Sequence, residues 1–266
     1  MEILDINLME IQRWNCCGTV YSLADDDLVH YLAPVRNLIR VKEQGNSKVA
    51  TLCSFCYNTL KRANLLMQRD KEKKKTLNDF MEEETDYNGE VEVVHVLQVL
   101  RDDVGWENIS KKVKTPLRGL KIAPYYGCTL LRPEEVAIDQ VEKPTILHRL
   151  MESIGAEPVD FPLANECCGS FQIVGNPDFV TRQAKEILSS ALRRGAEALV
   201  VTCPLCNFNL GRIQEELVQS IGDSQSIPIF YFSQLLALSL GLDPAVCHFE
   251  LSNGNPISFL KSKALI

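Results

Sequence analysis

Cysteine is the residue type whose spacing in this chain indicates chemistry. The sequence has ten cysteines, and eight of them form two recurring motifs. Two Cys-Cys-Gly motifs occupy Cys16–Gly18 and Cys167–Gly169, and each is followed by a Cys-x-x-Cys motif, at Cys53–Cys56 and Cys203–Cys206. The intervening segments are 35 and 34 residues long. Because both motifs and spacing recur, we expect two sites of common construction.

The chemistry of these sites follows from the thiol group. Thiolates are nucleophiles and metal ligands, and reducing compartments disfavour structural disulfides. The N-terminal segment carries acidic residues and lacks the features of a secretory signal. We therefore predict a cytoplasmic protein in which the cysteines bind metal or carry out redox chemistry.

Each Cys-x-x-Cys motif is expected between a strand and a helix. The apolar segments Lys48–Leu52 and Ala198–Thr202 predict short buried strands before the motifs. Helical patterns follow at Asn58–Met67 and Asn207–Val218. Unpaired backbone N–H groups and the helix dipole favour negative charge at the start of a helix, which suits thiolates.

The remaining elements extend this alternation. Gly119–Ala123 predicts another buried strand, which leads to Cys128. Thr145–Ile154 and Thr181–Arg194 predict helices closed by Gly155 and Gly195, respectively. Alternating strands and helices indicate an α/β protein with two pseudo-repeated βα halves, each with a mainly parallel sheet and a Cys-Cys-Gly motif.

We place the halves at residues 1–117 and 118–266, with the first incomplete at its start. The charged stretch Gln68–Glu90 is expected to be a surface insertion between the halves. Gly18 and Gly169 are expected to allow a tight turn or a close backbone approach to a bound group.

Charge and hydropathy exclude some functions. The net charge is −7 and the pI is about 5.3, which argues against a nucleic-acid-binding protein. The longest apolar stretch, Ile227–Leu242, is interrupted by Ser233, Gln234 and Ser239. It is too short to predict a membrane span.

Zinc is an alternative occupant of the cysteine sites, although adjacent cysteines converge poorly on one tetrahedral ion. A thioredoxin-like dithiol at Cys203–Cys206 is another, but it leaves the repeat unexplained. Cys247 lies outside both patterns. His30, His95 and His148 are interpreted as structural or surface residues, and the role of His248 stays open.

The second half resembles a known family. Cys128, Cys167, Cys168, Cys203 and Cys206 fit the pattern C-x(38)-C-C-x(34)-C-x-x-C. This pattern, together with Arg132–Glu134, Ile154–Val159 and Pro228–Leu235, resembles the cysteine-rich CCG domain family. That family is best known from the B subunit of heterodisulfide reductase, and the resemblance extends over nearly the whole chain.

The resemblance implies a cofactor and its ligands. In the family, a complete five-cysteine set is associated with a noncubane [4Fe–4S] cluster, and two such clusters cleave a heterodisulfide between them. Carried over, Cys128, Cys167, Cys168, Cys203 and Cys206 would hold one [4Fe–4S] cluster, and Cys16, Cys17, Cys53 and Cys56 would hold a second. The first half departs from the family here, because its fifth cysteine would fall before Met1.

Three functions are considered on this basis. The first is the catalytic iron–sulfur subunit of a heterodisulfide-reductase-like complex, supplied with electrons by a ferredoxin-like C subunit and a flavin-bearing A subunit. The second is an electron-transfer or docking subunit of a larger redox complex that could include a hydrogenase. The third is a zinc-stabilised binding module without redox chemistry.

Overall fold

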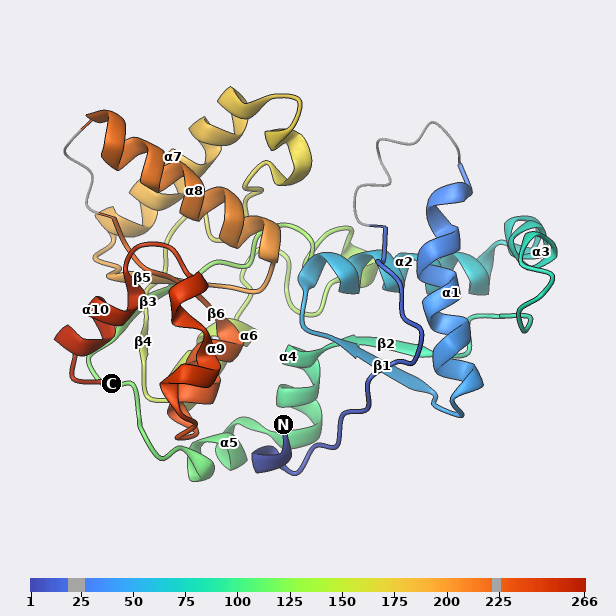
Figure 1. Cartoon of the computed structure of the whole chain (residues 1–266), viewed down its shortest axis with the longest axis horizontal. Helices are drawn as coiled ribbons and strands as arrows, with labels where there is room; N and C mark the ends of the chain where they lie inside the picture. Colours follow the sequence, from blue (N-terminus) through green and yellow to red (C-terminus); the bar gives the residue numbers. More distant parts are fainter. Residues whose placement is uncertain (19–26, 222–225) are drawn as a thin grey trace. The chain divides into compact units, whose positions relative to one another are not determined.

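The computed structural model describes residues 1–18, 27–221 and 226–266, and it divides into two compact units (Figure 1). The first unit is Asn7–Val99, and the second unit combines Met1–Ile6 with Leu100–Ile266. The boundary between the units therefore lies between Val99 and Leu100, whereas the sequence analysis placed the boundary of the halves after residue 117. The division of the chain into two cysteine-repeat halves, 1–117 and 118–266, stays a prediction.

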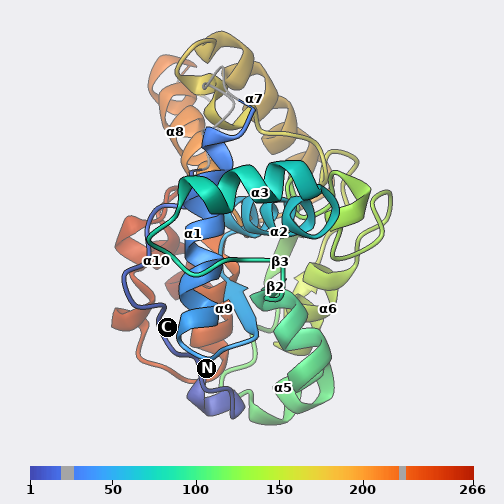
Figure 2. The same ribbon diagram turned by 90° about the vertical axis from the view of Figure 1, so that its right-hand side faces the viewer.

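The first unit is built on two parallel strands. Strands β1 (Lys48–Thr51) and β2 (Glu92–His95) pair with Lys48 opposite Glu92 and Thr51 opposite His95. Helix α2 (Ser54–Arg69) packs against α1 (Val29–Glu43) and α3 (Lys71–Phe80), as Figure 2 shows. The short helix α4 (Val96–Gln98) follows β2 directly, and a π-helical turn at Val99–Val104 continues from it.

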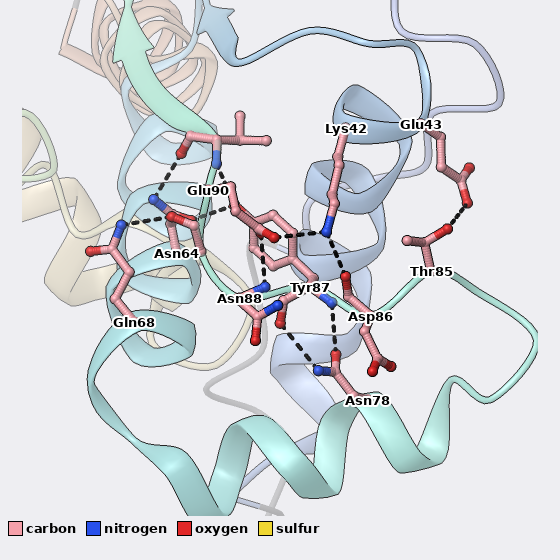
Figure 3. A network of polar contacts seen from close by, with 12 residues as sticks. Lys42, Glu43, Asn64, Gln68, Asn78, Thr85, Asp86, Tyr87, Asn88 and Glu90 are labelled. Carbon is pink, nitrogen blue, oxygen red and sulfur yellow. Dashed lines mark hydrogen bonds and ion pairs between the residues drawn. The ribbon is translucent and has the colours of Figure 1, made fainter.

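The charged stretch Gln68–Glu90 differs from its prediction. It lies inside the first unit, between α2 and β2, and is not placed between the halves. Leu77 and Tyr87 from this stretch are fully buried. The Tyr87 hydroxyl donates to Asn64 Oδ1, and Asn64 Nδ2 donates to the Val91 carbonyl at 2.9 Å (Figure 3). The mostly basic run at the start of α3, Lys71–Lys75, predicts a solvated surface, so nothing in the sequence indicated this buried polar network.

The second unit contains a four-stranded sheet in the order β4-β3-β5-β6, and every pair among its described strands is parallel. The strands are β3 (Lys121–Pro124), β4 (Glu157–Pro158), β5 (Ala198–Val201) and β6 (Ile229–Tyr231). All four residues of β5 are completely buried. Burial on both faces is typical of a parallel sheet covered by crossover helices. The sequence prediction of an α/β protein with parallel sheets is therefore confirmed.

The helices of the second unit alternate with its strands. They are α5 (Trp106–Lys112), α6 (Ile146–Ser153), α7 (Pro177–Arg193), α8 (Pro204–Ile221), α9 (Phe232–Ser239) and α10 (Pro256–Ser262). Helices α7 and α8 lie side by side in Figure 1. Short 3-10 turns occupy Glu2–Leu4, Glu134–Val136, Ser170–Ile173, Pro244–Cys247 and Phe249–Leu251.

The predicted and observed helices differ most in the residue at which each helix begins. Helices α2 and α8 begin at Ser54 and Pro204, three to four residues before their predicted starts. Helix α7 begins at Pro177, where the Asn176 side chain accepts the Phe179 N–H at 3.2 Å. The earlier starts place the second cysteine of each Cys-x-x-Cys motif within the first turn of a helix.

No helix in the described parts of the chain is both long and apolar enough to cross a membrane.

Candidate cysteine sites

Five cysteines of the second unit follow the carboxyl ends of adjacent strands. Cys128 comes after β3, and Cys167 and Cys168 lie in the segment after β4. Cys203 follows β5, and Cys206 occupies the first turn of α8. Because β4, β3 and β5 are parallel neighbours, their carboxyl ends meet at one edge of the sheet, where ligands bind in such folds.

The five thiols form one connected group. Cys168 Sγ lies 3.5 Å from Cys206 Sγ. Side-chain hydrogen bonds join Cys128 to Cys167, Cys167 to Cys168, and Cys206 to Cys203. The topology thus brings together every second-half cysteine that the sequence selected.

The charge on these thiols is distributed unequally. Hydrogen bonds from Cys128 and Cys168 lower the pKa of Cys167 to about 3, and the charge of Arg132 favours the same thiolate. Contact with Cys167 raises the pKa of Cys128. Contacts with Cys168 and Cys203, followed by burial, raise the pKa of Cys206. Adjacent thiolates repel one another, so full ionisation of the group requires cations shared among the sulfurs.

Several N–H groups point at these sulfurs. The Gly169 N–H donates to Cys167 Sγ at 3.3 Å, and the Ser170 N–H donates to Cys168 Sγ at 3.4 Å. Asn209 Nδ2 lies 3.5 Å from Cys168 Sγ and donates to the Ser170 carbonyl at 2.9 Å. Such donors stabilise thiolate charge. Sequence reasoning missed Asn209, although a polar residue on an apolar helix face one turn after the motif is a usable signal.

Two glycines allow the backbone to pass close to neighbouring side chains in this site. At Gly169, φ is +94° and a Cβ would lie 2.7 Å from Val180 Cγ2, so the position requires glycine. At Gly127, φ is +61° and a Cβ would lie 3.4 Å from Cys206 Sγ. The backbone before Cys128 therefore runs against the sulfur of Cys206.

The tyrosines before Cys128 point in different directions. The buried Tyr125 hydroxyl donates to the Glu166 carbonyl at 2.7 Å. Burial, and then the charges of four of the thiols, raise the pKa of Tyr125. Tyr126 instead places its hydroxyl 2.6 Å from His148 Nδ1. Tyr125 is thus the tyrosine that lies near the thiol group.

The first unit gathers three of its four predicted cysteines. Cys17 Sγ lies 3.1 Å from Cys56 Sγ, and Cys53 also hydrogen-bonds to Cys56. Cys53 is the N-cap of α2. Within the described residues, Cys16 is exposed and does not join this group. Gly18 has a positive φ of +77°.

His95, which the sequence analysis interpreted as a structural or surface residue, lies near Cys53 of this group. It is fully buried at the end of β2. Burial lowers the pKa of His95 to about 4, although the charge of Cys53 and the backbone of Leu52 oppose that shift. The ring is therefore neutral near pH 7. Cys247, in contrast, donates to the Gln234 carbonyl at 3.7 Å, away from both thiol groups.

A model of the cysteine-rich CCG domain matches residues 1–61 and 122–211 of this chain. These ranges include all nine patterned cysteines and more than half of the sequence. The chain belongs to the CCG cysteine-rich domain family.

Curated relatives of this CCG protein extend over most of its length. It is 34% identical over 242 residues to the 8-methylmenaquinol:fumarate reductase membrane anchor subunit of Wolinella succinogenes, with 90% of this chain and 84% of the relative aligned. It is 29% identical to the B subunit of the ferredoxin/F(420)H(2)-dependent CoB-CoM heterodisulfide reductase of Methanosarcina acetivorans, over 98% of this chain and 88% of the relative. An Archaeoglobus profundus protein, named for its likeness to the B subunit of heterodisulfide reductase, is 30% identical over 91% and 83%. The resemblance to the B subunit is therefore confirmed.

A solved structure shares this fold. A hypothetical protein from Helicobacter pylori superposes with a TM-score of 0.70 at 13% identity. The match covers 88% of this CCG protein and 43% of that chain.

The donor set of the CCG protein fits a multi-iron cluster better than a single ion. In the described parts of the chain, no three cysteine, histidine or carboxylate side chains converge as ligands of one ion. In an iron–sulfur cluster the thiolates bind different irons and need not converge. Five sulfurs lie at one sheet edge, and N–H donors are directed at two of them. This arrangement is suited to thiolates that bind different irons of one cluster.

Proposed function

We propose that this protein is the iron–sulfur catalytic subunit of a heterodisulfide-reductase-like complex and that it reduces, or forms, a thiol disulfide. The observation that carries the proposal is the connected group of five thiols at the carboxyl edge of the second unit's sheet. Membership of the CCG family and the two relatives named for the B subunit of heterodisulfide reductase support the same reaction type.

The cofactors in this proposal are two [4Fe–4S] clusters. Cys128, Cys167, Cys168, Cys203 and Cys206 would hold one cluster, of the noncubane type, and Cys16, Cys17, Cys53 and Cys56 would hold the other. When bound, such a cluster supplies electrons and iron atoms with affinity for sulfur. Around it, the N–H groups of Gly169 and Ser170 would stabilise thiolate charge.

The partners we propose are a ferredoxin-like C subunit and a flavin-bearing A subunit, with a hydrogenase as a further source of electrons. We place the complex in the cytoplasm, because nine cysteines serve as metal ligands in this proposal and reducing compartments disfavour their pairing as structural disulfides.

An electron-transfer or docking role is the second candidate, and a specific observation favours it. In the described part of the first unit, three thiols are in contact and Cys16 is apart from them. The two sites are therefore unequal, which suits a protein whose first site relays electrons. The name of the Wolinella succinogenes relative also describes a subunit that is not itself called catalytic.

The deciding experiment is the measurement of iron and acid-labile sulfide in anaerobically purified protein, with electron paramagnetic resonance after oxidation in the presence of a thiol. The catalytic proposal predicts about eight irons and about eight sulfides per chain, with a thiol-dependent signal. About four irons without that signal favour the relay role. Zinc without sulfide would overturn both and leave a zinc-stabilised binding module.

A further inference from the structure

Strand β1 of the first unit and strand β5 of the second unit occupy equivalent positions. Thr51 and Val201 each precede the first cysteine of a Cys-x-x-Cys motif by two residues. The parallel register places Thr51 opposite His95 on β2, and it places Val201 opposite Tyr231 on β6. The pair β1–β2 is therefore the counterpart of the pair β5–β6.

The two strands differ in their neighbours. Strand β5 pairs with β3 on one side and with β6 on the other, whereas among the described residues β1 pairs with β2 alone (Figure 1). All four residues of β5 are buried, but only one of the four in β1 is. Leu52, directly after β1, is 49% exposed, and its counterpart Thr202 is 1% exposed. The position that β3 fills in the second unit is thus open in the described part of the first unit.

Ala50 is the residue whose backbone faces the open side of β1. Successive residues of a strand direct their N–H and C=O groups to opposite sides. The Ser47 carbonyl accepts the Glu92 N–H at 2.8 Å, so every second residue from Ser47 faces β2, and Ala50 faces away. Its counterpart Val200 accepts the N–H of Tyr125, the residue after β3, at 2.9 Å. Within the described parts of the chain, no backbone donor takes that place at Ala50.

The opposite edge of this two-stranded sheet is closed by side chains. On β2, the Val93 carbonyl accepts the Lys61 ammonium at 3.4 Å, and the His95 N–H donates to Gln98 Oε1 at 3.0 Å. Both contacts come from the first unit itself and use backbone groups that face away from β1. The described residues therefore satisfy one edge of the sheet and leave the other edge for a further strand.

The open edge also lacks the usual protection against strand addition. Exposed edges are commonly protected by charged side chains, by proline or by a bulge. Apart from Lys48 at its start, β1 contains neither a charged residue nor proline, and Leu52 extends it. All four residue pairs between β1 and β2 follow a regular register. An unprotected edge of this kind is suited to a partner that adds a strand.

We propose that the β1 edge of the first unit binds an extended, apolar segment of a partner polypeptide as a parallel strand. Strand β3 shows the chemistry that fits such an edge, because Ile122 and Ala123 are fully buried and pair with β5 in parallel. Backbone hydrogen bonds supply the affinity of strand addition, and side-chain packing supplies its specificity.

The bound strand would run in the direction of Cys53, which follows Leu52 and is the N-cap of α2. The β1 edge thus offers a docking position next to the segment that carries the first Cys-x-x-Cys motif. Only the consequence that the partner belongs to a redox complex rests on the proposed function, whereas the strand site does not.

The first test uses the peptide Gly119–Tyr126, acetylated and amidated, as the probe and measures its affinity for the full-length protein by fluorescence anisotropy. The unmodified peptide should bind saturably. N-methylation at Tyr125 removes the N–H that pairs with Val200 in the second unit, and we expect a loss of affinity of about tenfold. N-methylation at Tyr126 is the matched control, because that N–H donates to Ala164, outside β5, and it should not change the affinity. Absence of binding, or equal affinity of all three peptides, would overturn the proposal.

Hydrogen exchange then locates the bound peptide. At saturation, exchange of the Ala50 amide should slow by about tenfold or more, and exchange of the Val200 amide should not change. Ala50→Pro removes an N–H that faces away from β2, so it should abolish peptide binding and keep the β1–β2 pairing. Should this variant not fold, protection of Ala50 in the wild-type protein decides alone. Protection elsewhere, with Ala50 unaffected, would contradict the assigned edge.

Further outcomes separate this inference from the proposed function. A concentration-dependent dimer that excludes the peptide, seen by analytical ultracentrifugation, would assign the edge to a second copy of the chain and overturn the proposal. Peptide binding by protein that lacks iron and sulfide would refute the proposed function and support the strand site. A full complement of iron in protein that does not bind the peptide would do the reverse.

Discussion

Cys168 and Cys206 lie with their sulfurs 3.5 Å apart, although one belongs to the segment after β4 and the other to the first turn of α8. Two chain segments that are remote in sequence meet here because β4, β3 and β5 are adjacent parallel strands. The contact links the Cys-Cys-Gly motif to the Cys-x-x-Cys motif and so defines one site from two sequence patterns.

Replacement of Cys206 should empty this site selectively. Cys206→Ser removes a central member of the connected thiols, and we expect iron content to fall by about half, from about eight to about four per chain. Iron and sulfide analysis with electron paramagnetic resonance measures the loss. Cys247→Ser is the matched control, because Cys247 is equally buried but lies outside both thiol groups. Equal iron loss in both variants would show that Cys206 has no special role.

Asn209 should affect both the free energy of unfolding and the reduction potential of the second-unit cluster. Asn209→Leu removes the donor to Cys168 Sγ and leaves the Ser170 carbonyl without that hydrogen bond. We expect a loss of about 1–3 kcal/mol in the free energy of unfolding, measured by urea denaturation. The second-unit cluster should also shift to a more negative potential, because a thiolate loses a donor.

Gln214→Leu, on the same helix, separates these two effects. Gln214 exchanges two hydrogen bonds with the backbone of Ile227, at 2.9 and 3.0 Å, away from the cysteines. It should reduce stability to a similar extent and leave the potential unchanged. A shift of equal size in both variants would mean that the potential responds to general destabilisation.

The cysteine sites were predictable wherever the signal is local. A strand, a Cys-x-x-Cys motif and a helix follow one another within a few residues, so the sequence alone places Cys203 and Cys206 at a strand end. The separation of Cys16 from Cys17 was not predictable, because the motif does not show which of two adjacent cysteine side chains points toward the site. The packing of the Cys-Cys-Gly segment against α1 decides which one turns inward, and Asn15 fixes that segment by donating its N–H to Asn37 Oδ1 at 3.0 Å.

Other features could not be predicted because they depend on contacts between segments far apart in the sequence. His95 and Tyr231 become equivalent only once the strand register is known, since their sequence surroundings share just an apolar strand and a glutamine three residues later. Tyr87 lies within a charged stretch that predicts an exposed surface, yet the chain returns there to cover α2. The hydropathy of a segment does not show whether the chain folds back over another helix.

The Tyr87 hydroxyl should stabilise the first unit. It donates to Asn64 Oδ1 and accepts the Val91 N–H at 3.2 Å, and all three residues are buried (Figure 3). Tyr87→Phe leaves both partners without this hydrogen bond, so we expect a loss of about 1–3 kcal/mol in the free energy of unfolding. Thr85→Val is the control from the same segment, because Thr85 makes an exposed hydrogen bond to Glu43 at 3.3 Å. Its effect should stay within about 0.5 kcal/mol, and similar losses in both variants would contradict the assignment.

Glu90 should make the stability of the first unit sensitive to acid. Partial burial opposes ionisation of this carboxyl, but hydrogen bonds from Lys42 and from the Asn88 backbone outweigh it, and the pKa of Glu90 falls below its ordinary value of 4.5. Because the folded state holds the proton less tightly, Glu90 stabilises the fold above pH 4.5, and this contribution is lost as the pH falls through the lower, folded-state pKa. The Lys42 ammonium lies 2.7 Å from the Glu90 carboxylate.

Urea denaturation from pH 7 to pH 3 measures this contribution. Glu90→Gln should be less stable than wild type at pH 7, and the difference should shrink as the pH falls below 4.5, because the wild-type carboxyl becomes neutral as well. Glu92→Gln is the matched control, since its 4.0 Å ion pair with Lys48 is exposed on both sides and such pairs contribute little. A Glu90→Gln deficit that persists unchanged at pH 3 would assign the effect to the shape of the side chain, since a charge interaction cannot survive protonation of its carboxylate.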